Sequence, residues 1–217
     1  MKILLVAATV KEIDPFLKKF RDEKKLFHSR HDIDILVTGA GLMATAAILS
    51  RQINLKRPGL AIQAGVAGGF GKKITPGEVV VVTKDRVADQ GVMEINEFKD
   101  VFDLGLAALN KFPYRAGWLE NRQRKLIRQT KLKAVAAISV NQVSTGKLAG
   151  IFADKYDAAI ESMEGAAFHF VCLSEKIPFL QLRAVSNSVG ERNKEKWELL
   201  TAIRNLNEKL SLFLQEL

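Results

Sequence analysis

The length, composition and charge of the chain limit the classes of protein to which it can belong. Its 217 residues are 47% hydrophobic and 26% charged, which is typical of a globular protein and excludes collagen-like and disordered chains. No apolar run reaches the roughly 18 residues that a membrane span needs. At about 150 residues per domain, this length predicts one domain, 1–217, whose core needs no disulfide or metal. The single cysteine, Cys172, excludes an intramolecular disulfide and favours a reducing, cytoplasmic location.

Basic residues are in excess. Lys and Arg number 33 against 24 Asp and Glu, which gives a formal net charge of +9. The range 111–133 holds eight of these basic residues and one acid, Glu120. We interpret this stretch as a solvated basic surface, with nucleic-acid binding as the alternative.

Short aliphatic runs alternate with helical patterns along the chain. The first run, 2–8, gives way to the polar segment 11–14, which predicts a β-strand rather than a secretory signal. Later runs contain continuous apolar stretches, such as 79–82 and 134–138, as strands do when both faces of an α/β sheet are covered. The pattern predicts strands at 2–8, 33–38, 60–65, 78–83, 134–139 and 179–186, and helices near 10–20, 41–55, 100–111, 119–131, 163–176 and 194–214. This alternation predicts a layered α/β domain.

A glycine motif after the second predicted strand resembles a dinucleotide-binding fingerprint. Residues 39–44, Gly-Ala-Gly-Leu-Met-Ala, fit G-x-G-x-x-A. That fingerprint also needs an acid about 20 residues further on, which binds the ribose hydroxyls. Because residues 35–77 contain no Asp or Glu, we reject an NAD or FAD site and expect no cofactor.

Glycines concentrate directly after the predicted strand at 60–65. Five of the 15 glycines fall within residues 65–77. Glycine at the carboxyl end of a strand lets the backbone approach a ligand closely, and in α/β sheets ligands bind at that end. The structural alternative is a loop that needs positive φ for its own sake.

Acidic and polar side chains near strand and helix ends are the candidates for chemistry. Glu12 begins a predicted helix, where it is either a proton acceptor for a water or a first-turn acid favoured by the helix dipole. Glu164 either caps its helix or binds paired hydroxyls. Arg183, Ser186 and Asn187 end a buried strand. No cluster of His or Cys predicts a metal site, and His169, alone on its helix, is interpreted as structural.

Four motifs occur in the order found in purine nucleoside phosphorylases and methylthioadenosine/adenosylhomocysteine nucleosidases. They are Glu12, Gly65–Gly69, Ser162–Ala166 and Arg183–Asn187. The resemblance covers essentially the whole chain and implies a three-layer nucleoside phosphorylase-like fold, a central mixed sheet flanked by helices. Within this superfamily, Ser186–Arg192 followed by Trp197 is most similar to the futalosine hydrolases. That branch implies hydrolysis of futalosine to hypoxanthine and dehypoxanthine futalosine during menaquinone synthesis, by a homodimer.

The resemblance also implies roles for individual side chains. Glu12 positions or activates the water, Glu164 binds the ribose hydroxyls, and Met163 packs beneath the sugar. Val143 stands where the family usually places an aromatic or aliphatic wall beside the base. The remaining substrate-binding positions that the resemblance implies are Gly65, Val66 and Ser162.

Asn187 differs from the adenine-specific nucleosidases, which carry Asp at this position. A protonated aspartic acid gives a proton to N7 and accepts from the 6-amino group. An asparagine amide instead donates to a 6-oxo group and accepts from a protonated N7. The sequence therefore favours hypoxanthine or guanine as the released base, with Asn187 as a catalytic residue beside Glu12 and Glu164.

Gln63 and Val66 stand where hexameric phosphorylases hold phosphate with Arg and Ser. The loss of a cation and a hydroxyl removes charge-assisted hydrogen bonds that phosphate needs, so water is the favoured nucleophile. The alternatives are a phosphorylase, a methylthioadenosine-type nucleosidase and a basic nucleic-acid-binding domain without catalysis.

Overall fold

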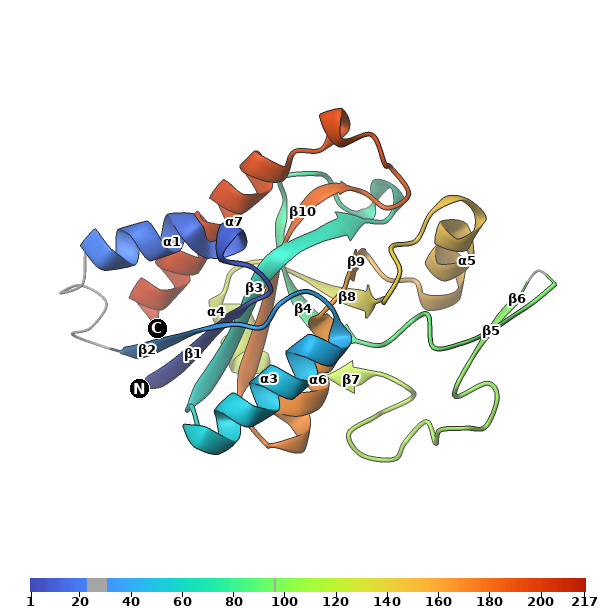
Figure 1. The fold of residues 1–217 in the computed structure, drawn as a ribbon, viewed down its shortest axis with the longest axis horizontal. Helices are drawn as coiled ribbons and strands as arrows, with labels where there is room; N and C mark the ends of the chain where they lie inside the picture. The colour runs from blue at the N-terminus through green and yellow to red at the C-terminus, as the bar shows by residue number, and fades with distance from the viewer. Residues whose placement is uncertain (23–30, 96) are drawn as a thin grey trace.

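A mixed β-sheet forms the centre of the computed structural model, which describes residues 1–22, 31–95 and 97–217. The strands in this part of the chain are β1 (Lys2–Ala7), β2 (Asp32–Val37), β3 (Leu60–Gly69), β4 (Val79–Asp85), β7 (Leu119–Glu120), β8 (Lys133–Ser139), β9 (Ile160–Ser162) and β10 (Phe179–Ser188). A separate hairpin pairs β5 (Gly91–Glu94) with β6 (Glu97–Asp100). The hairpin extends away from the sheet, at the right of Figure 1.

Helices cover both faces of the sheet. They are α1 (Val10–Asp22), α3 (Leu42–Leu55), α4 (Arg124–Gln129), α5 (Gly146–Tyr156), α6 (Gly165–Ser174) and α7 (Leu199–Glu216). Figure 1 shows α1 and α7 on one side, with α3 and α6 on the other. Strand β1 shows why: Ile3 and Leu5 pack toward α1 and α7, whereas Leu4 and Val6 pack toward α3 and α6. Side chains alternate along a strand, so an apolar strand needs a layer on each face, and the predicted three-layer fold is confirmed.

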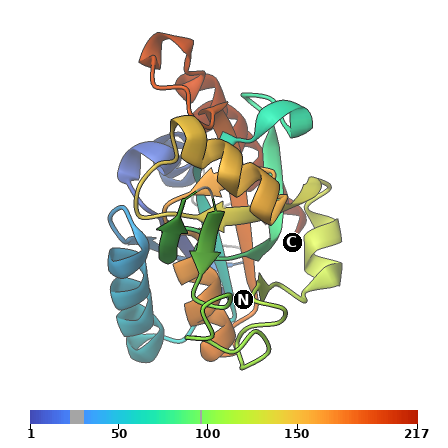
Figure 2. The ribbon, with the colours of Figure 1, turned by 90° about the vertical axis from the view of Figure 1, so that its right-hand side faces the viewer.

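Five of the strands close into a ring. The sheet order is β10-β4-β8-β9-β3-β1-β2, with β7 beside β4, and β10 also pairs with β3. The ring is therefore β10-β4-β8-β9-β3, and β1 and β2 extend from it. Figure 2 shows α5 crossing in front of these strands, with α3 and α4 on opposite sides. A buried aliphatic cluster with members on all five ring strands includes Ala67, Val80, Ala137, Ile160 and Val185.

Strand β3 changes its partner along one edge. Residues 60–63 pair with β1, and Gly68 and Gly69 pair with β9. Between them, residues 64–67 pair only with β10. We call this opening, residues 64–67, the β3 fork. Because no strand satisfies that edge at the fork, its backbone N–H and C=O groups are free to bind side chains.

The predicted strands are confirmed, but two predicted helices are wrong. The chain turns repeatedly over 101–118 instead of forming a helix. Asp100 accepts hydrogen bonds from the backbone N–H groups of Phe102 (2.9 Å) and Asp103 (3.1 Å), and such side-chain bonds compete with helix formation. The predicted helix at 119–131 is limited to α4, because Leu119 and Glu120 pair with β4.

The basic stretch 111–133 lies at the surface. All eight of its basic side chains are exposed, as a solvated surface requires. Three of them have acidic partners: Arg115 with Glu120 at 3.5 Å, Lys131 with Glu216 at 2.8 Å and Lys133 with Glu78 at 3.6 Å.

Candidate active site

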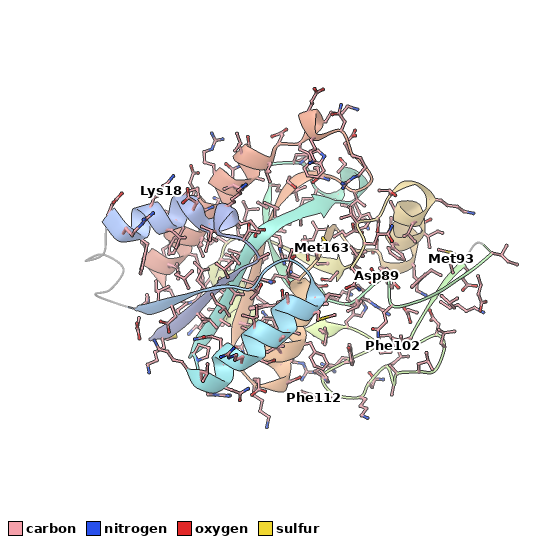
Figure 3. The ribbon with its side chains drawn as sticks, viewed as in Figure 1. Lys18, Asp89, Met93, Phe102, Phe112 and Met163 are labelled. Carbon is pink, nitrogen blue, oxygen red and sulfur yellow. The ribbon has the colours of Figure 1, made fainter. Side chains whose placement is uncertain are left out.

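A pocket of about 380 Å³ opens at the β3 fork. It collects residues from the ends of β3, β9 and β10 and from the start of α1. Figure 3 shows Met163 at the middle of the molecule, whereas Met93 and Phe112 lie on the outlying hairpin and loop. Seven of the eight predicted site residues line this pocket: Glu12, Val66, Val143, Ser162, Met163, Glu164 and Asn187.

Glu12 joins helix α1 to the fork. It lies in the first turn of α1 and is 8% exposed. Its Oε2 accepts hydrogen bonds from the backbone N–H (2.9 Å) and the hydroxyl (3.1 Å) of Thr9, as a first-turn acid does. Its Oε1 accepts the Val66 N–H at 3.0 Å. One carboxylate thus closes the helix start and also binds the backbone that β3 leaves unpaired at the fork.

Glu164 occupies the N-cap position of α6, but its side chain makes no capping hydrogen bond. Its Oε1 accepts the Gly41 N–H at 3.1 Å, and its Oε2 accepts from Nη1 of Arg183 at 3.3 Å. The Ser139 hydroxyl accepts the N–H of Ala166 at 2.8 Å instead. The helix-cap alternative for Glu164 is therefore wrong. Gly41 belongs to the glycine motif at 39–44 that resembles a dinucleotide fingerprint. In this structure its backbone N–H binds the Glu164 carboxylate.

Arg183 is a buried cation behind the pocket, only 1% exposed. Besides its ion pair with Glu164, its Nη1 donates to the Val66 carbonyl at 3.2 Å and its Nη2 donates to Oε1 of Gln63 at 3.1 Å. A buried guanidinium needs both a counter-charge and acceptors. Gln63 therefore helps to hold Arg183, and its side chain does not line the pocket.

Gly65 lies behind the pocket rather than in its wall. A Cβ atom at this position would be 2.4 Å from Nη1 of Arg183 and 2.8 Å from Oε1 of Glu12. Only a residue without a side chain leaves room for both groups. The glycine predicted to bind substrate thus leaves space for Glu12, which lines the pocket, and for Arg183, which lies behind it.

Asn187 presents an amide whose orientation is fixed. Its Oδ1 accepts from the Ser186 hydroxyl at 2.7 Å, and its Nδ2 donates to the Ser188 carbonyl at 2.9 Å. An amide has two N–H donors and an oxygen with two lone pairs. One donor and one lone pair are therefore left for a ligand.

The walls beside this amide are mostly apolar. Met163 is half-buried, and Val143 is 36% exposed on the opposite loop. Ser162 is buried, and its Oγ accepts the Gly165 N–H at 3.4 Å, so it supports the start of α6 as well as lining the pocket. Apolar walls with a few fixed polar groups are typical of small-molecule sites.

Several residues that line the pocket were not predicted. Lys11 and Arg192 bring positive charge, and Arg192 lies 5.6 Å from the ring centroid of Trp197. Trp197 was noted as a mark of family resemblance and as part of the predicted 194–214 helix, whereas α7 begins at Leu199. Glu161 adds a third buried carboxylate to the wall. Lys11 and Glu161 each neighbour a predicted residue in the sequence, which was the one available signal.

Buried titratable groups also lie outside the pocket wall. Burial lowers the pKa of His169 to about 4, so the ring is neutral and its Nδ1–H donates to the Leu119 carbonyl at 2.8 Å. Burial raises the pKa of Asp85 to about 7, although Ser139 and Gln181 donate to its carboxylate. His169 is structural, as interpreted from the sequence, and Cys172 is likewise buried.

Among residues 1–22, 31–95 and 97–217, no three His, Cys, Asp or Glu side chains are grouped so as to hold a metal ion. None of the helices in this part of the chain combines the length and apolar character needed to span a membrane.

A protein-family model described as the phosphorylase superfamily matches residues 2–217. The chain belongs to the phosphorylase superfamily. It is 30% identical over 190 residues to futalosine hydrolase of Thermus thermophilus, covering 83% of this chain and 80% of that one. It is 25% identical over 197 residues to 5'-methylthioadenosine/S-adenosylhomocysteine nucleosidase of Haemophilus influenzae, covering 86% of each.

The fold matches solved structures of this superfamily along the whole chain. The native structure of futalosine hydrolase from Helicobacter pylori superposes with a TM-score of 0.81 at 19% identity, covering 100% of this chain and 98% of that one. The nucleoside phosphorylase-like fold and the enzyme class, an N-glycosyl hydrolase of the nucleosidase type, are thus confirmed at the level of the family.

Proposed function

We propose that this protein hydrolyses the N-ribosidic bond of futalosine, a 6-oxopurine nucleoside, and releases hypoxanthine, a step of menaquinone synthesis. All 217 residues would form one domain, and the protein would act in the cytoplasm. Futalosine hydrolases among the relatives support this proposal. The observation that carries it is the fixed amide of Asn187.

The hydrogen-bond donor and the lone pair that Asn187 leaves unused match a 6-oxopurine. Ser186 and Ser188 occupy one lone pair of Oδ1 and one N–H of Nδ2. The second N–H is left to donate to O6, and the second lone pair is left to accept from a protonated N7. Adenine presents a 6-amino donor instead of O6, so an amide held in this orientation fits it poorly. A mismatched polar contact in a buried site costs about 1–3 kcal/mol.

The carboxylates favour charge separation across the ribosidic bond. Cleavage develops positive charge on the ribose and negative charge on the departing base, and the site should stabilise that distribution. In the proposed mechanism Glu12 positions and deprotonates the water, and Glu164 accepts hydrogen bonds from the ribose hydroxyls. As the bond between the ribose carbon and N9 breaks, the base takes up a proton from solvent at N7, and Asn187 accepts from that N7–H and donates to O6. Met163 packs beneath the sugar.

Features of the pocket rim fit an acidic substrate. Lys11 and Arg192 are candidate partners for the futalosine carboxylate, because both line the pocket where Trp197 supplies an aromatic surface. Gln63 stands at the position where phosphorylases bind phosphate, and its Oε1 instead accepts a hydrogen bond from Arg183. This hydrogen bond supports water rather than phosphate as the nucleophile.

A second copy of the chain would cover the outlying hairpin and loop. Exposed apolar side chains gather there, including Ile95 (97% exposed), Leu106 (76%) and Phe112 (64%). Exposed apolar side chains gathered on one part of a surface are typical of association sites, and the superfamily resemblance implies a homodimer.

Chromatography of the base released from futalosine and from its 6-amino counterpart tests the proposal. In phosphate-free buffer we expect hypoxanthine from futalosine, much faster than adenine from the 6-amino compound. Asn187→Asp should shift the ratio of kcat/KM toward the 6-amino substrate, because a protonated carboxyl can donate to N7 and accept from the amino group. Strict dependence on phosphate would indicate a phosphorylase, and preferred adenine release would indicate the methylthioadenosine-type alternative. Salt-dependent duplex binding without base release would indicate the nucleic-acid-binding alternative.

A further inference from the structure

Asp85 is a fully buried carboxylate behind the pocket, and the proposed reaction assigns it no role. It is the last residue of β4. Its Oδ1 accepts a hydrogen bond from the Ser139 hydroxyl of β8 at 2.9 Å, and its Oδ2 accepts one from Nε2 of Gln181 of β10 at 3.2 Å. A buried carboxylate is costly unless hydrogen bonds stabilise it. These two bonds therefore fix the place of Asp85 among three strands of the ring.

Ser139 takes the place of the side-chain cap that helix α6 lacks. An N-cap side chain normally accepts the backbone N–H of the second or third helical residue. In α6 the second helical residue is Ala166, and its N–H donates to the Ser139 hydroxyl at 2.8 Å. The hydrogen of that hydroxyl is directed to Asp85, which leaves an oxygen lone pair for Ala166. Asp85 therefore holds Ser139 as the acceptor at the start of α6.

Gly165 brings the start of α6 directly against Asp85. A Cβ atom at Gly165 would lie 2.1 Å from Oδ2 of Asp85 and 2.2 Å from Nε2 of Gln181. Both distances lie below 3.0 Å, where a Cβ atom would overlap its neighbour, so only glycine lets the first turn of the helix pack on this pair. The helix start is thus fixed twice, by the Ser139 hydrogen bond and by contact with the carboxylate.

Glu164 is the residue that this arrangement releases. It occupies the N-cap position of α6, yet its carboxylate accepts hydrogen bonds from the Gly41 N–H and from Arg183. An unsatisfied N–H at a helix start attracts a nearby carboxylate. Because the Ala166 N–H is already bound, it does not draw the Glu164 carboxylate away from the pocket.

We propose that Asp85 is a positioning residue for Glu164: by holding Ser139 as the cap of α6, it keeps the Glu164 carboxylate free to bind the ribose hydroxyls. This inference rests on the proposed function, in which Glu164 has that role, and adds a residue that does not contact the substrate. Asp85 does not line the pocket, so its effect on the reaction passes through α6. Its removal therefore weakens recognition of the ribose in particular.

The ratio of kcat/KM for futalosine to kcat/KM for its 2′-deoxy analogue measures this recognition, because the analogue lacks a hydroxyl that Glu164 would bind. Asp85→Ala should lower the ratio roughly 10-fold, the scale of a lost hydrogen bond to a charged group. A pocket that is merely loosened would lower both values of kcat/KM together and leave the ratio unchanged. Asp85→Asn should keep the wild-type ratio, because its amide oxygen still accepts from Ser139. The Gln181 amide can then turn to present Oε1, which has no hydrogen-bond partner within the described residues.

Thr83→Val is the matched control. Thr83 also lies on β4, and its hydroxyl donates to the Val135 carbonyl of β8 at 3.0 Å, so the variant loses a hydrogen bond between the same two strands but none at α6. Its ratio should equal that of wild type. Glu164→Gln should lower the ratio by itself, and adding Asp85→Ala to it should lower the ratio no further, because both changes remove the same contact.

A wild-type ratio in folded Asp85→Ala would overturn the role of Asp85 and leave the proposed function standing. If that variant does not fold, Ser139→Ala takes its place, because it removes the capping hydroxyl and leaves Asp85 bound to Gln181. Its ratio should fall in the same way, and an unchanged ratio would overturn the inference. A wild type that releases no hypoxanthine from futalosine would overturn the proposed function and, with it, the inference.

Discussion

Replacing Gly65 with alanine would place one methyl group against the side chains of both Arg183 and Glu12. The new Cβ would lie 2.4 Å from Nη1 of Arg183, and ordinary contact begins at 3.4 Å, so the guanidinium has to move by about 1 Å. Arg183 is buried and bound to the Val66 carbonyl and to Glu164, so this movement breaks at least one of these contacts. A 1 Å misplacement at an active site can cost about 100-fold in rate.

We therefore expect Gly65→Ala to lower kcat/KM for hypoxanthine release about 100-fold. Overpacking should lower the free energy of unfolding by about 1–3 kcal/mol, measured by denaturant titration. Gly150→Ala is the matched control, because a Cβ at Gly150 in α5 meets no atom within 4 Å. That variant should keep wild-type turnover and gain up to about 1 kcal/mol from alanine's helix propensity. Wild-type turnover and stability in Gly65→Ala would refute this account of the glycine.

Two further predictions concern the titratable groups. Glu12→Gln should lower turnover by roughly two orders of magnitude or more, the scale of general acid–base assistance; near-normal single-turnover base release in the folded variant would remove Glu12 from the mechanism. The pKa of His169 is about 4 in the folded state against 6.5 for a free side chain. Below pH 6.5 the unfolded chain therefore binds a proton that the folded chain does not bind. The free energy of unfolding decreases as the pH is lowered. Relative to His169→Gln, wild type should lose roughly 2 kcal/mol between pH 7 and pH 5. The comparison with the variant is needed because Asp85, with its pKa raised to about 7, makes stability fall as pH rises over the same range. A pH-independent difference in denaturant titrations would show that the ring is not held neutral.

The parts of the fold that were predictable are those decided by burial. The run 79–82 is apolar throughout because both sheet faces are covered, and that pattern is visible in the sequence. The loop at 101–118 was not predictable from periodicity, because one side chain, Asp100, binds the backbone that a helix would use. Helix α5 was missed because it contains Gly146 and Gly150, and glycine disfavours a helix.

The candidate-site residues that lie in family motifs could be predicted from the sequence. Those that reach the site only through the pairing register of the strands could not. Glu12 and Glu164 stand within recognisable motifs. Glu161 lies on a strand of three residues, too short for any periodicity, and its relation to Asn187 exists only through their shared pairing with Gly68. Lys11 lies beside Glu12 in the sequence and Arg192 ends the Ser186–Arg192 motif, but neither position shows in the sequence alone that its side chain lines the pocket.

At the β3 fork, the backbone amide proton of Val66 can report on the Glu12 carboxylate. The amide proton of Val66 is bound by the Glu12 carboxylate at 3.0 Å, whereas strand hydrogen bonds hold most other amides of β3. A charged acceptor deshields an amide proton more than a neutral one does, and it strengthens the hydrogen bond. The nuclear magnetic resonance shift of this single backbone proton therefore follows the protonation state of Glu12 directly, with no label introduced into the pocket.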